Sequence, residues 1–175
     1  MNASFPVDGL PLERLRAGAM DWSGELPSDS AAWSIPDLVF DGPPRLELRL
    51  TENAGGRIHL SGRLQASVGL ACRRCLTDLV QDVSVPLDLW LEPSLEPWEE
   101  TEGVYGYDPS AAMLDLLRPL REELSLSLPD YPVCDEECRG LCAGCGAALK
   151  DEPCACGSDE IDPRWEALRN QMRTE

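Results

Sequence analysis

The sequence contains one histidine, no glycine-rich phosphate loop and no long hydrophobic run. The histidine, His59, falls on the polar face of a predicted strand, away from any candidate nucleophile. No Ser, His, Asp constellation is present. No apolar stretch approaches the roughly 20 residues that cross a bilayer. These absences argue against an enzyme and against a membrane partner.

Basic residues are also scarce. Fifteen Lys and Arg residues oppose 32 Asp and Glu residues, which gives a formal net charge of −17. A chain this acidic repels phosphates and releases few nucleic-acid counterions, so free RNA is a poor partner on charge alone. A basic protein would be attracted instead, and ribosomal proteins offer such surfaces. The alternative interpretation is that the acidity serves solubility only.

The N-terminal residues 1–15 lack the basic region, apolar stretch and small-residue cleavage site of an export signal. We therefore expect a soluble, cytoplasmic protein. A reducing cytosol disfavours disulfides, so the eight cysteines are better explained as metal ligands.

Residues 45–91 alternate between apolar and polar positions, which is typical of half-buried strands. One strand is predicted over 45–50 and a second over 58–72, separated by a turn signal at 53–56. A third run places alternate residues of 83–91 on one apolar face. Three strands with short connections predict an antiparallel meander that is covered on one side.

A helix is predicted over residues 115–127, because leucines recur there at helical spacing. Asp115 would be its N-cap, and Pro119 lies close enough to the first turn to be tolerated. The helix would pack on the meander, which gives an α+β core domain of residues 1–133. Residues 134–175 would form a Cys-rich zinc-binding module with a short C-terminal helix, docked on the core.

Other segments give weaker patterns. Residues 1–40 allow only short elements, including a helical turn around Leu12 to Arg16. The acidic, proline-spaced stretch 92–100 predicts a solvated loop. Trp90 falls opposite the apolar face, either exposed for a partner or covered by the N-terminal segment. A closing helix would begin at Asp162 and Pro163, with an apolar stripe of Trp165, Leu168 and Met172.

The eight cysteines carry the chemistry that the sequence offers. They include two CxxC pairs, and the full set is Cys72, Cys75, Cys134, Cys138, Cys142, Cys145, Cys154 and Cys156. Four thiolates satisfy tetrahedral zinc and leave no position open, which is typical of a structural site. The sequence therefore predicts two structural Zn²⁺ ions.

The cysteine spacings permit several pairings of these residues into sites. We prefer a division that joins Cys72 and Cys75 to Cys134 and Cys138. The second site would then contain the four remaining thiols, those of Cys142, Cys145, Cys154 and Cys156. Structural zinc contributes on the order of 10 kcal/mol to folding, so the cysteine-rich tail should unfold without metal.

Other uses of these thiols compete with zinc binding. Disulfides fit the even count but lack support from an export signal. Iron–sulfur clusters also bind sets of four thiolates. A redox dithiol at Cys72 and Cys75 lacks a surrounding βαβ pattern, although Arg73 and Arg74 between them could lower the thiol pKa. Cys138, Cys142 and Cys145 match the CxxxCxxC spacing of radical enzymes that use S-adenosylmethionine, but only thirty residues follow the motif.

Several ordered motifs resemble the YceD family of large-ribosomal-RNA accumulation proteins. The similarity covers residues from about 45 to the end and lies in four stretches of sequence: Cys72-Arg73-Arg74-Cys75-Leu76, Arg121 to Pro129, Cys138 to Gly146, and Asp162-Pro163-Arg164-Trp165.

The resemblance implies a non-catalytic ribosome biogenesis factor that promotes accumulation or processing of large-subunit ribosomal RNA. A basic large-subunit ribosomal protein, or an immature large subunit (pre-50S particle), would be its partner. The alternative is a zinc-dependent nucleic-acid-binding regulator, with local RNA contact through Arg63, Arg73 and Arg74. Absence of a basic stripe favours the first hypothesis.

Overall fold

A computed structural model describes residues 9–16, 18–29, 33, 35, 38–96, 100–150, 154, 156 and 163–165. The chain divides into two compact units. The sheet unit comprises Met1–Leu70 and Leu79–Asp130, and the cysteine unit comprises Ala71–Asp78 and Tyr131–Glu175. The turn 71–78 thus groups with the C-terminal segment, whereas the sequence assigned it to the core. Docking of residues 134–175 on the core stays a prediction.

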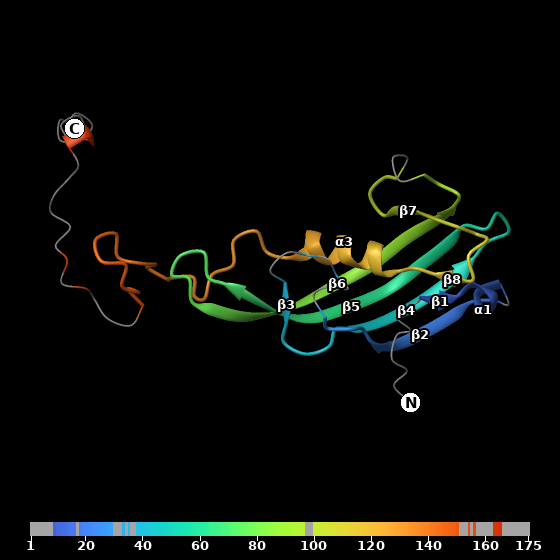
Figure 1. Ribbon diagram of the computed structural model, residues 1–175, viewed down its shortest axis with the longest axis horizontal. Helices are drawn as coiled ribbons and strands as arrows, with labels where there is room; N and C mark the ends of the chain where they lie inside the picture. The colour runs from blue at the N-terminus through green and yellow to red at the C-terminus, as the bar shows by residue number, and fades with distance from the viewer. Residues whose placement is uncertain are drawn as a thin grey trace. The chain divides into compact units, whose positions relative to one another are not determined.

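The sheet unit is built on a six-stranded sheet (Figure 1). Five strands lie in the order β2-β4-β5-β6-β7, and β3 pairs separately with β5. Their bounds are β2 Met20–Glu25, β3 Val39–Phe40, β4 Arg45–Glu52, β5 Ile58–Ala71, β6 Asp78–Pro93 and β7 Val104–Tyr107. The central β4-β5-β6 strands confirm the predicted meander, and the turn at 53–56 joins β4 to β5.

The predicted antiparallel meander is confirmed in part: the sheet has a further strand at each edge, and one of the two pairs parallel. β2 adds an antiparallel strand to β4, with Met20 opposite Leu50. β7 pairs parallel with β6, with Trp90 opposite Val104. Both edge strands are short and contain glycine, Gly24 in β2 and Gly106 in β7. Glycine weakens a strand pattern, so local alternation gave no signal for either.

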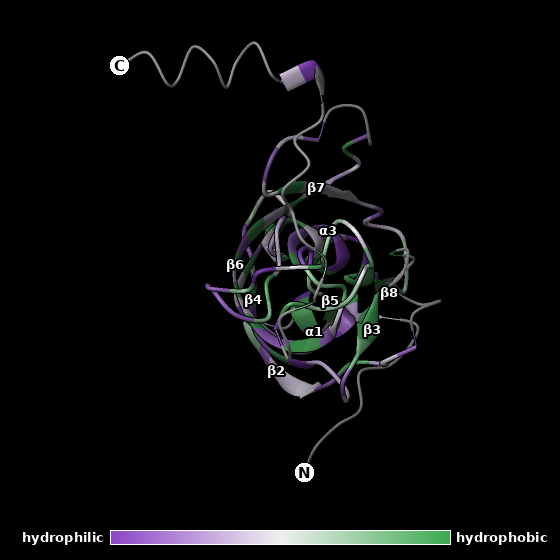
Figure 2. Ribbon diagram, turned by 90° about the vertical axis from the view of Figure 1, so that its left-hand side faces the viewer, coloured by the Kyte–Doolittle hydropathy of each residue, from purple (hydrophilic) through white to green (hydrophobic). Residues whose placement is uncertain are grey.

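The apolar face of the sheet packs against two helices. Leu12 and Leu15 of α1 (Leu12–Arg16) and Leu120 and Leu124 of α3 (Leu117–Ser127) join one cluster with the inward strand residues. Buried residues recur at alternate positions over much of β5 and β6, and Figure 2 shows both hydrophobic (green) and hydrophilic (purple) stretches on the strands. Each fully buried leucine is worth about 1.5–3 kcal/mol over exposure, so this cluster stabilises the unit. The helical turn expected at Leu12 to Arg16 is confirmed.

α3 starts later than predicted. Leu116 occupies the N-cap, and the Asp115 carboxylate accepts the backbone N–H of Leu117 at 2.9 Å. The prediction of Asp115 as N-cap is therefore wrong by one position. Pro119 is the third helical residue, where an N–H has no intrahelical acceptor, so its ring fits the first turn.

The stretch 92–100 is not simply a solvated loop. Glu92 and Pro93 end β6, and the side chain of Glu100 is only 11% exposed. Its carboxylate accepts the Gly106 N–H at 2.8 Å and forms an ion pair with Arg118 of α3. Tertiary contacts thus cover most of an acidic side chain that local composition predicted to be solvated. Residues 97–99 lie outside the described residues.

Trp90 lies on the other face of β6, as the alternation predicted. His59 stacks on its ring with centroids 4.5 Å apart, and the Arg57 guanidinium lies 4.9 Å from the ring centroid. The described contacts that cover Trp90 therefore come from β5 and the preceding turn. Coverage by the N-terminal residues 1–8 falls outside the described part of the chain.

Three short elements complete the description. β1 (Leu10–Pro11) pairs antiparallel with β8 (Met113–Leu114) in a second small sheet. Near the C-terminus, Pro163–Trp165 form the 3₁₀ turn η2. Asp162, Leu168 and Met172 of the predicted closing helix lie outside the described residues. Within the part of the chain that is described, no helix has the length and apolar character needed to cross a membrane.

Candidate metal centres

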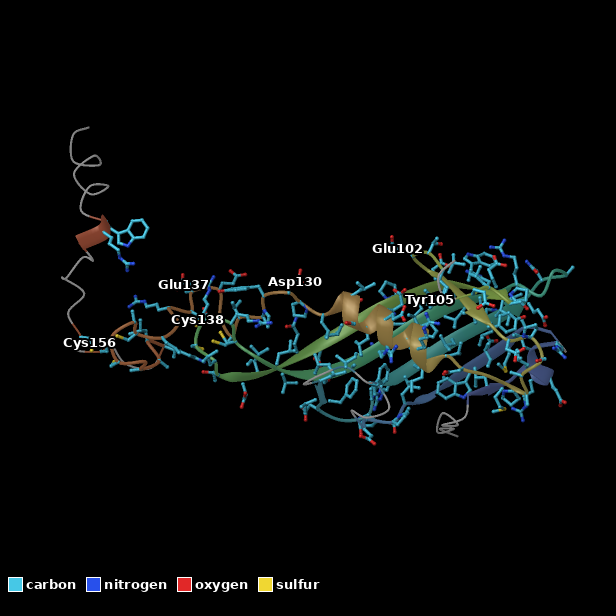
Figure 3. The ribbon with its side chains drawn as sticks, turned by 45° about the horizontal axis from the view of Figure 1, so that its top comes forward. Glu102, Tyr105, Asp130, Glu137, Cys138 and Cys156 are labelled. Carbon is cyan, nitrogen blue, oxygen red and sulfur yellow. The ribbon has the colours of Figure 1, made fainter. Side chains whose placement is uncertain are left out.

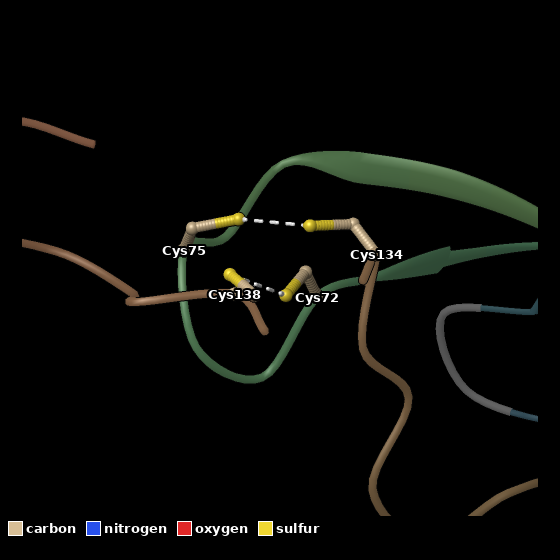
Figure 4. Close-up of side chains that lie close together, drawn as sticks. All are labelled: Cys72, Cys75, Cys134 and Cys138. Atoms are coloured by element: carbon tan, nitrogen blue, oxygen red, sulfur yellow. Dashed lines mark hydrogen bonds between the residues drawn. The ribbon is translucent and has the colours of Figure 1, made fainter. Parts of the chain in front are cut away.

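Four cysteines from two distant segments meet in the cysteine unit, and we call them the first cysteine set. Cys72 and Cys75 lie in the turn between β5 and β6, and Cys134 and Cys138 lie after α3 (Figure 4). All four Sγ atoms lie within 4.8 Å of one another. The Sγ atoms of Cys72 and Cys138 are 3.9 Å apart, and those of Cys75 and Cys134 are 3.6 Å apart.

These separations fit a tetrahedral ion. Thiolates bind zinc at about 2.3 Å, which puts the sulfurs of a tetrahedron about 3.8 Å apart. All four donor atoms of the first set are cysteine sulfurs, and the set contains no histidine or carboxylate. Four thiolate ligands leave no position for a substrate, so the chemistry of the donor set is that of a structural site.

The first CxxC pair forms a tight knuckle. Leu76 N–H donates to the Cys72 carbonyl at 2.9 Å, and Cys72 N–H donates to the Thr77 carbonyl at 2.9 Å. This return of the chain requires a left-handed residue at Leu76, whose φ is 61°. A leucine in that region costs about 1–2 kcal/mol, because its Cβ crowds the following carbonyl.

Hydrogen bonds join the knuckle to the segment that supplies the other two ligands. Arg73 N–H donates to the Pro132 carbonyl at 2.9 Å. The Arg74 guanidinium donates through Nη1 to the carbonyls of Glu136 and Cys138, at 2.9 and 3.0 Å. Gly140 lies so close that a Cβ there would be 2.9 Å from the Arg74 carbonyl oxygen. These contacts join the two ligand-bearing segments in addition to the four thiols.

The second cysteine set contains Cys142, Cys145, Cys154 and Cys156, again with all Sγ atoms within 4.8 Å. Its knuckle repeats the first one, with Gly146 N–H donating to the Cys142 carbonyl at 2.9 Å and Cys142 N–H donating to the Ala147 carbonyl at 2.8 Å. Here the left-handed position is filled by Gly146, with a φ of 74°. Figure 3 labels Cys138 and Cys156, one from each set, and they lie in separate groups of sulfur atoms.

The two sets differ in exposure. Cys72, Cys75 and Cys138 are buried and Cys134 is half-buried. In the second set Cys145 and Cys156 are exposed, and the other two are half-buried. Gly144 lies close to Cys156, since a Cβ at Gly144 would be 3.4 Å from the Cys156 Cβ. The second set is therefore the one that solvent and competing ligands reach directly.

The thiol acidities follow from the knuckle geometry. The pKa of Cys72 is lowered to about 6, chiefly because the Cys75 backbone N–H stabilises its thiolate. The pKa of Cys142 is also lowered to about 6, first by the Cys154 thiol and then by the Cys145 and Gly144 N–H groups. One other thiol in each set holds its proton more tightly. The pKa of Cys134 is raised to about 12 by the Cys75 thiol, and the pKa of Cys156 is raised to about 12 by the Cys145 thiol.

The structure thus brings together the two sets of four that we preferred from the spacing. Metal binding by these eight residues stays a prediction, and the donor chemistry is compatible with zinc. None of the eight cysteines forms a disulfide.

Sequence reasoning missed two contacts around the first set. Arg74 was named as able to lower the thiol pKa, and its backbone N–H does lower that of Cys72; the binding of its guanidinium to two carbonyl oxygens was not predicted. The Thr77 hydroxyl oxygen lies 3.3 Å from the Cys75 Sγ, and by donating to the thiolate this hydroxyl lowers the pKa of Cys75. Spacing alone gave no signal for either contact, because both depend on how the segments meet.

Comparisons with known proteins identify relatives of this chain. The family model described as large ribosomal RNA subunit accumulation protein YceD matches residues 60–170, which include both cysteine sets. The chain belongs to the YceD family. An uncharacterized protein of Mycobacterium tuberculosis is 33% identical over 162 residues, covering 91% of this chain and 78% of the relative.

More distant members of this YceD family extend beyond bacteria. A protein of Mycobacterium leprae, also uncharacterized, is 32% identical over 137 residues, or 77% of this chain and 62% of that protein. The chloroplastic YCED homolog 1 of Arabidopsis thaliana, named a large ribosomal RNA subunit accumulation protein, is 24% identical over 141 residues. That match covers 65% of this chain and 44% of the plant protein. No solved structure matches the chain.

Proposed function

We propose that this YceD-family chain is a non-catalytic ribosome biogenesis factor that promotes accumulation of large-subunit ribosomal RNA. The family match over residues 60–170 carries the proposal. The plant relative's printed name, an accumulation protein of the large ribosomal RNA subunit, supports the same pathway. The action that we assign is binding, since two closed sets of four thiols offer structure and no open coordination position.

The distribution of charge supports a basic ribosomal protein, or an immature large subunit that presents one, as the partner. The sheet unit has 21 acidic and 8 basic side chains, a net charge of −13. The cysteine unit has 11 acidic and 7 basic side chains, a net charge of −4, which completes the total of −17. A basic surface would therefore be attracted mainly to the sheet unit.

The basic residues of the sheet are largely paired already. Arg45 lies 3.9 Å from Glu25, and Arg49 lies 3.6 Å from Asp21. Arg57 pairs with Glu92. Exposed pairs of this kind add at most about 1 kcal/mol to stability, but they cancel the positive charge on these strands. The remaining acids then dominate the field that a partner meets.

The test is a pull-down of tagged full-length protein from a native bacterial lysate at low and high salt. Ribosomal proteins and ribosomal RNA would be identified in the eluate, and zinc would be measured in the same material. We expect a large-subunit protein to be recovered at low salt and lost at high salt. The same material should contain about two zinc ions per chain. Zinc-loaded protein that recovers no ribosomal component would overturn the proposal.

Charge-reversal variants make the same experiment specific for the sheet unit. Glu13→Lys with Glu102→Lys alters two exposed acids of that unit and should reduce recovery of the basic partner. Glu136→Lys with Glu137→Lys is the matched control, since it changes the net charge equally in the cysteine unit. Equal losses from both variants would show that total charge, and not the sheet unit, sets the affinity. RNA recovered without ribosomal protein would favour the nucleic-acid-binding regulator.

A further inference from the structure

The first knuckle exposes a leucine in a strained conformation. Leu76 has a φ of 61° and a side chain that is 65% exposed. The second knuckle has the same two backbone hydrogen bonds and places Gly146 at the matching position. Glycine would serve the turn without strain. A leucine here is therefore unfavourable for the turn and unused in the described core, so its side chain is available to a ligand.

An exposed aromatic residue lies next to this knuckle along the backbone. Tyr131 is 60% exposed, and its neighbour Pro132 accepts the Arg73 N–H at 2.9 Å. Leu76 and Tyr131 are thus on adjoining segments of the cysteine unit. Isolated exposed apolar residues are common on protein surfaces, but here an exposed aromatic residue and an exposed leucine in a strained conformation belong to two segments that a backbone hydrogen bond joins.

Three arginines lie in the two segments that contain Leu76 and Tyr131. In the described part of the chain, Arg73, Arg74 and Arg139 form no ion pair with a carboxylate. Arg74 donates to two carbonyls, which leaves its positive charge uncompensated. Arg73 and Arg139 are exposed, and Gly140, next to Arg139, packs against the Arg74 backbone.

The local charge is also permissive for an anion. Residues 71–78 and 131–150 contain four basic side chains against four acidic ones. One of those acids, Asp135, accepts the Glu137 N–H at 2.8 Å within its own turn. By contrast, the sheet unit has a net charge of −13. Of the two units, the cysteine unit is the one where a phosphate backbone meets the weaker repulsion.

We propose that Leu76, Tyr131 and Arg73 form a contact site for an unpaired, single-stranded segment of RNA. Sequence-tolerant binding of single strands combines an aromatic side chain that stacks on a base with cationic groups for the phosphates. Tyr131 supplies the ring, Arg73 supplies the charge, and Leu76 packs against a base or sugar. Unpaired loops are the part of RNA whose bases can be reached in this way.

This inference rests on the proposed function, in the form in which the partner is an immature large subunit and therefore contains RNA. In this proposal the two units bind different partners: the sheet unit attracts a basic protein, and the cysteine unit contacts unpaired RNA. The whole chain is acidic, so the RNA contact alone is weak. We expect a dissociation constant on the order of 10–100 µM for a short oligonucleotide at low salt.

The test uses zinc-loaded full-length protein and a fluorescently labelled, unstructured single-stranded RNA of mixed sequence. Leu76→Gly is the decisive variant, because it removes the side chain and relieves the strain of the left-handed turn. It should retain zinc and thermal stability and bind the RNA about tenfold more weakly, as should Tyr131→Ala. Arg73→Gln should reduce the slope of log affinity against log salt by about 0.7, the value for one phosphate on a single strand.

Matched controls lie in the sheet unit. Leu126→Ala removes another leucine, 77% exposed on α3, and Arg14→Gln removes another exposed arginine. Neither should change RNA binding. The proposal is overturned if wild-type protein shows no binding at about 1 mM, well above the range for non-specific association, or if the three site variants bind like wild type.

The outcomes separate this inference from the proposed function. Recovery of a large-subunit protein in the pull-down, combined with no RNA binding, would refute the contact site and leave the biogenesis role standing. RNA binding that is lost in Leu76→Gly, without any ribosomal component in the pull-down, would support the site and refute the biogenesis role.

Discussion

The sheet unit and the cysteine unit are stabilised in different ways. In the sheet unit, one cluster of buried side chains joins the strands to α1 and α3. In the described part of the cysteine unit, buried apolar surface is small: apart from Pro132 and Gly140, the buried residues are Cys72, Cys75 and Cys138. The sheet unit can therefore rely on apolar burial, whereas we predict that the cysteine unit needs bonds to an ion. Four predictions test this difference, from the largest expected effect to the smallest.

Loss of one ligand should unfold the cysteine unit and spare the sheet unit. Cys138→Ser removes a buried ligand of the first cysteine set, and structural zinc is worth on the order of 10 kcal/mol. We expect dispersed amide NMR signals to persist for residues 45–70 and 79–93 and to collapse for residues 131–150. Cys156→Ser, in the exposed second set, is the control and should preserve the signals of residues 131–138. Global unfolding of Cys138→Ser would contradict the comparison.

Acidification should release metal, because zinc binds thiolates and protons compete for them. The Cys75 thiol and burial raise the pKa of Cys134; against the lowering effect of the Gly140 N–H, burial and the Cys75 thiol also raise the pKa of Cys138. Zinc binding at pH 7 should therefore expel at least the two protons of these thiols, so zinc affinity should rise by at least about 100-fold per pH unit near neutrality and fall as pH is lowered.

The loss of affinity should steepen below pH 6, where Cys72 and Cys142, each with a pKa lowered to about 6, also become protonated. Competition with a chromophoric chelator at several pH values measures this dependence. The exposed second set should exchange its ion first. A pH-independent affinity would show that the thiols are not the ligands.

Truncation of a core residue should destabilise the sheet unit and leave the cysteine unit unchanged, the reverse of the effect of losing a ligand. Leu124→Ala removes a fully buried side chain of α3 and should lower the free energy of unfolding of the sheet unit by about 2–5 kcal/mol. Zinc content should not change. Leu126→Ala on the same helix is 77% exposed and should cost less than about 0.5 kcal/mol. Chemical denaturation with zinc measured in parallel tests both; similar costs for the two variants would contradict the assigned core.

The smallest effect concerns the contacts of the Glu100 side chain with β7 and α3. Its carboxylate accepts the Gly106 N–H and pairs with Arg118, whose pKa it raises. Glu100→Gln leaves the guanidinium with only the half-exposed Glu122 and should cost about 1–3 kcal/mol. Glu122→Gln removes an exposed i,i+4 pair and should cost about 0.3–0.5 kcal/mol. Denaturation midpoints distinguish them, and the reverse order would place the anchoring role on Glu122.

How much could be predicted from the sequence depended on whether the signal was local. β4, β5 and β6 were predicted because alternation marks a strand with one buried face. α3 was predicted from its leucine spacing, with its start misplaced by two residues. The edge strands β2 and β7 were missed, because short, glycine-containing segments become strands through the neighbour they pair with.

The candidate site shows the same division. Eight cysteines, as two CxxC pairs and four further positions, indicate metal sites through their number and spacing alone. The roles of Arg74 and Thr77, and the exposure of Leu76, could not be predicted, because each depends on which distant segment lies beside the knuckle.

By itself the sequence determined the ligand chemistry, the acidity and the central strands, since thiol count, charge and short-range periodicity are properties of composition and of neighbouring residues. Only the tertiary structure decided which thiols meet, that the Glu100 side chain is largely covered, and that one knuckle presents a strained leucine to solvent. Those features arise where segments separated by tens of residues come together, and the energy of such contacts is not encoded in any one segment.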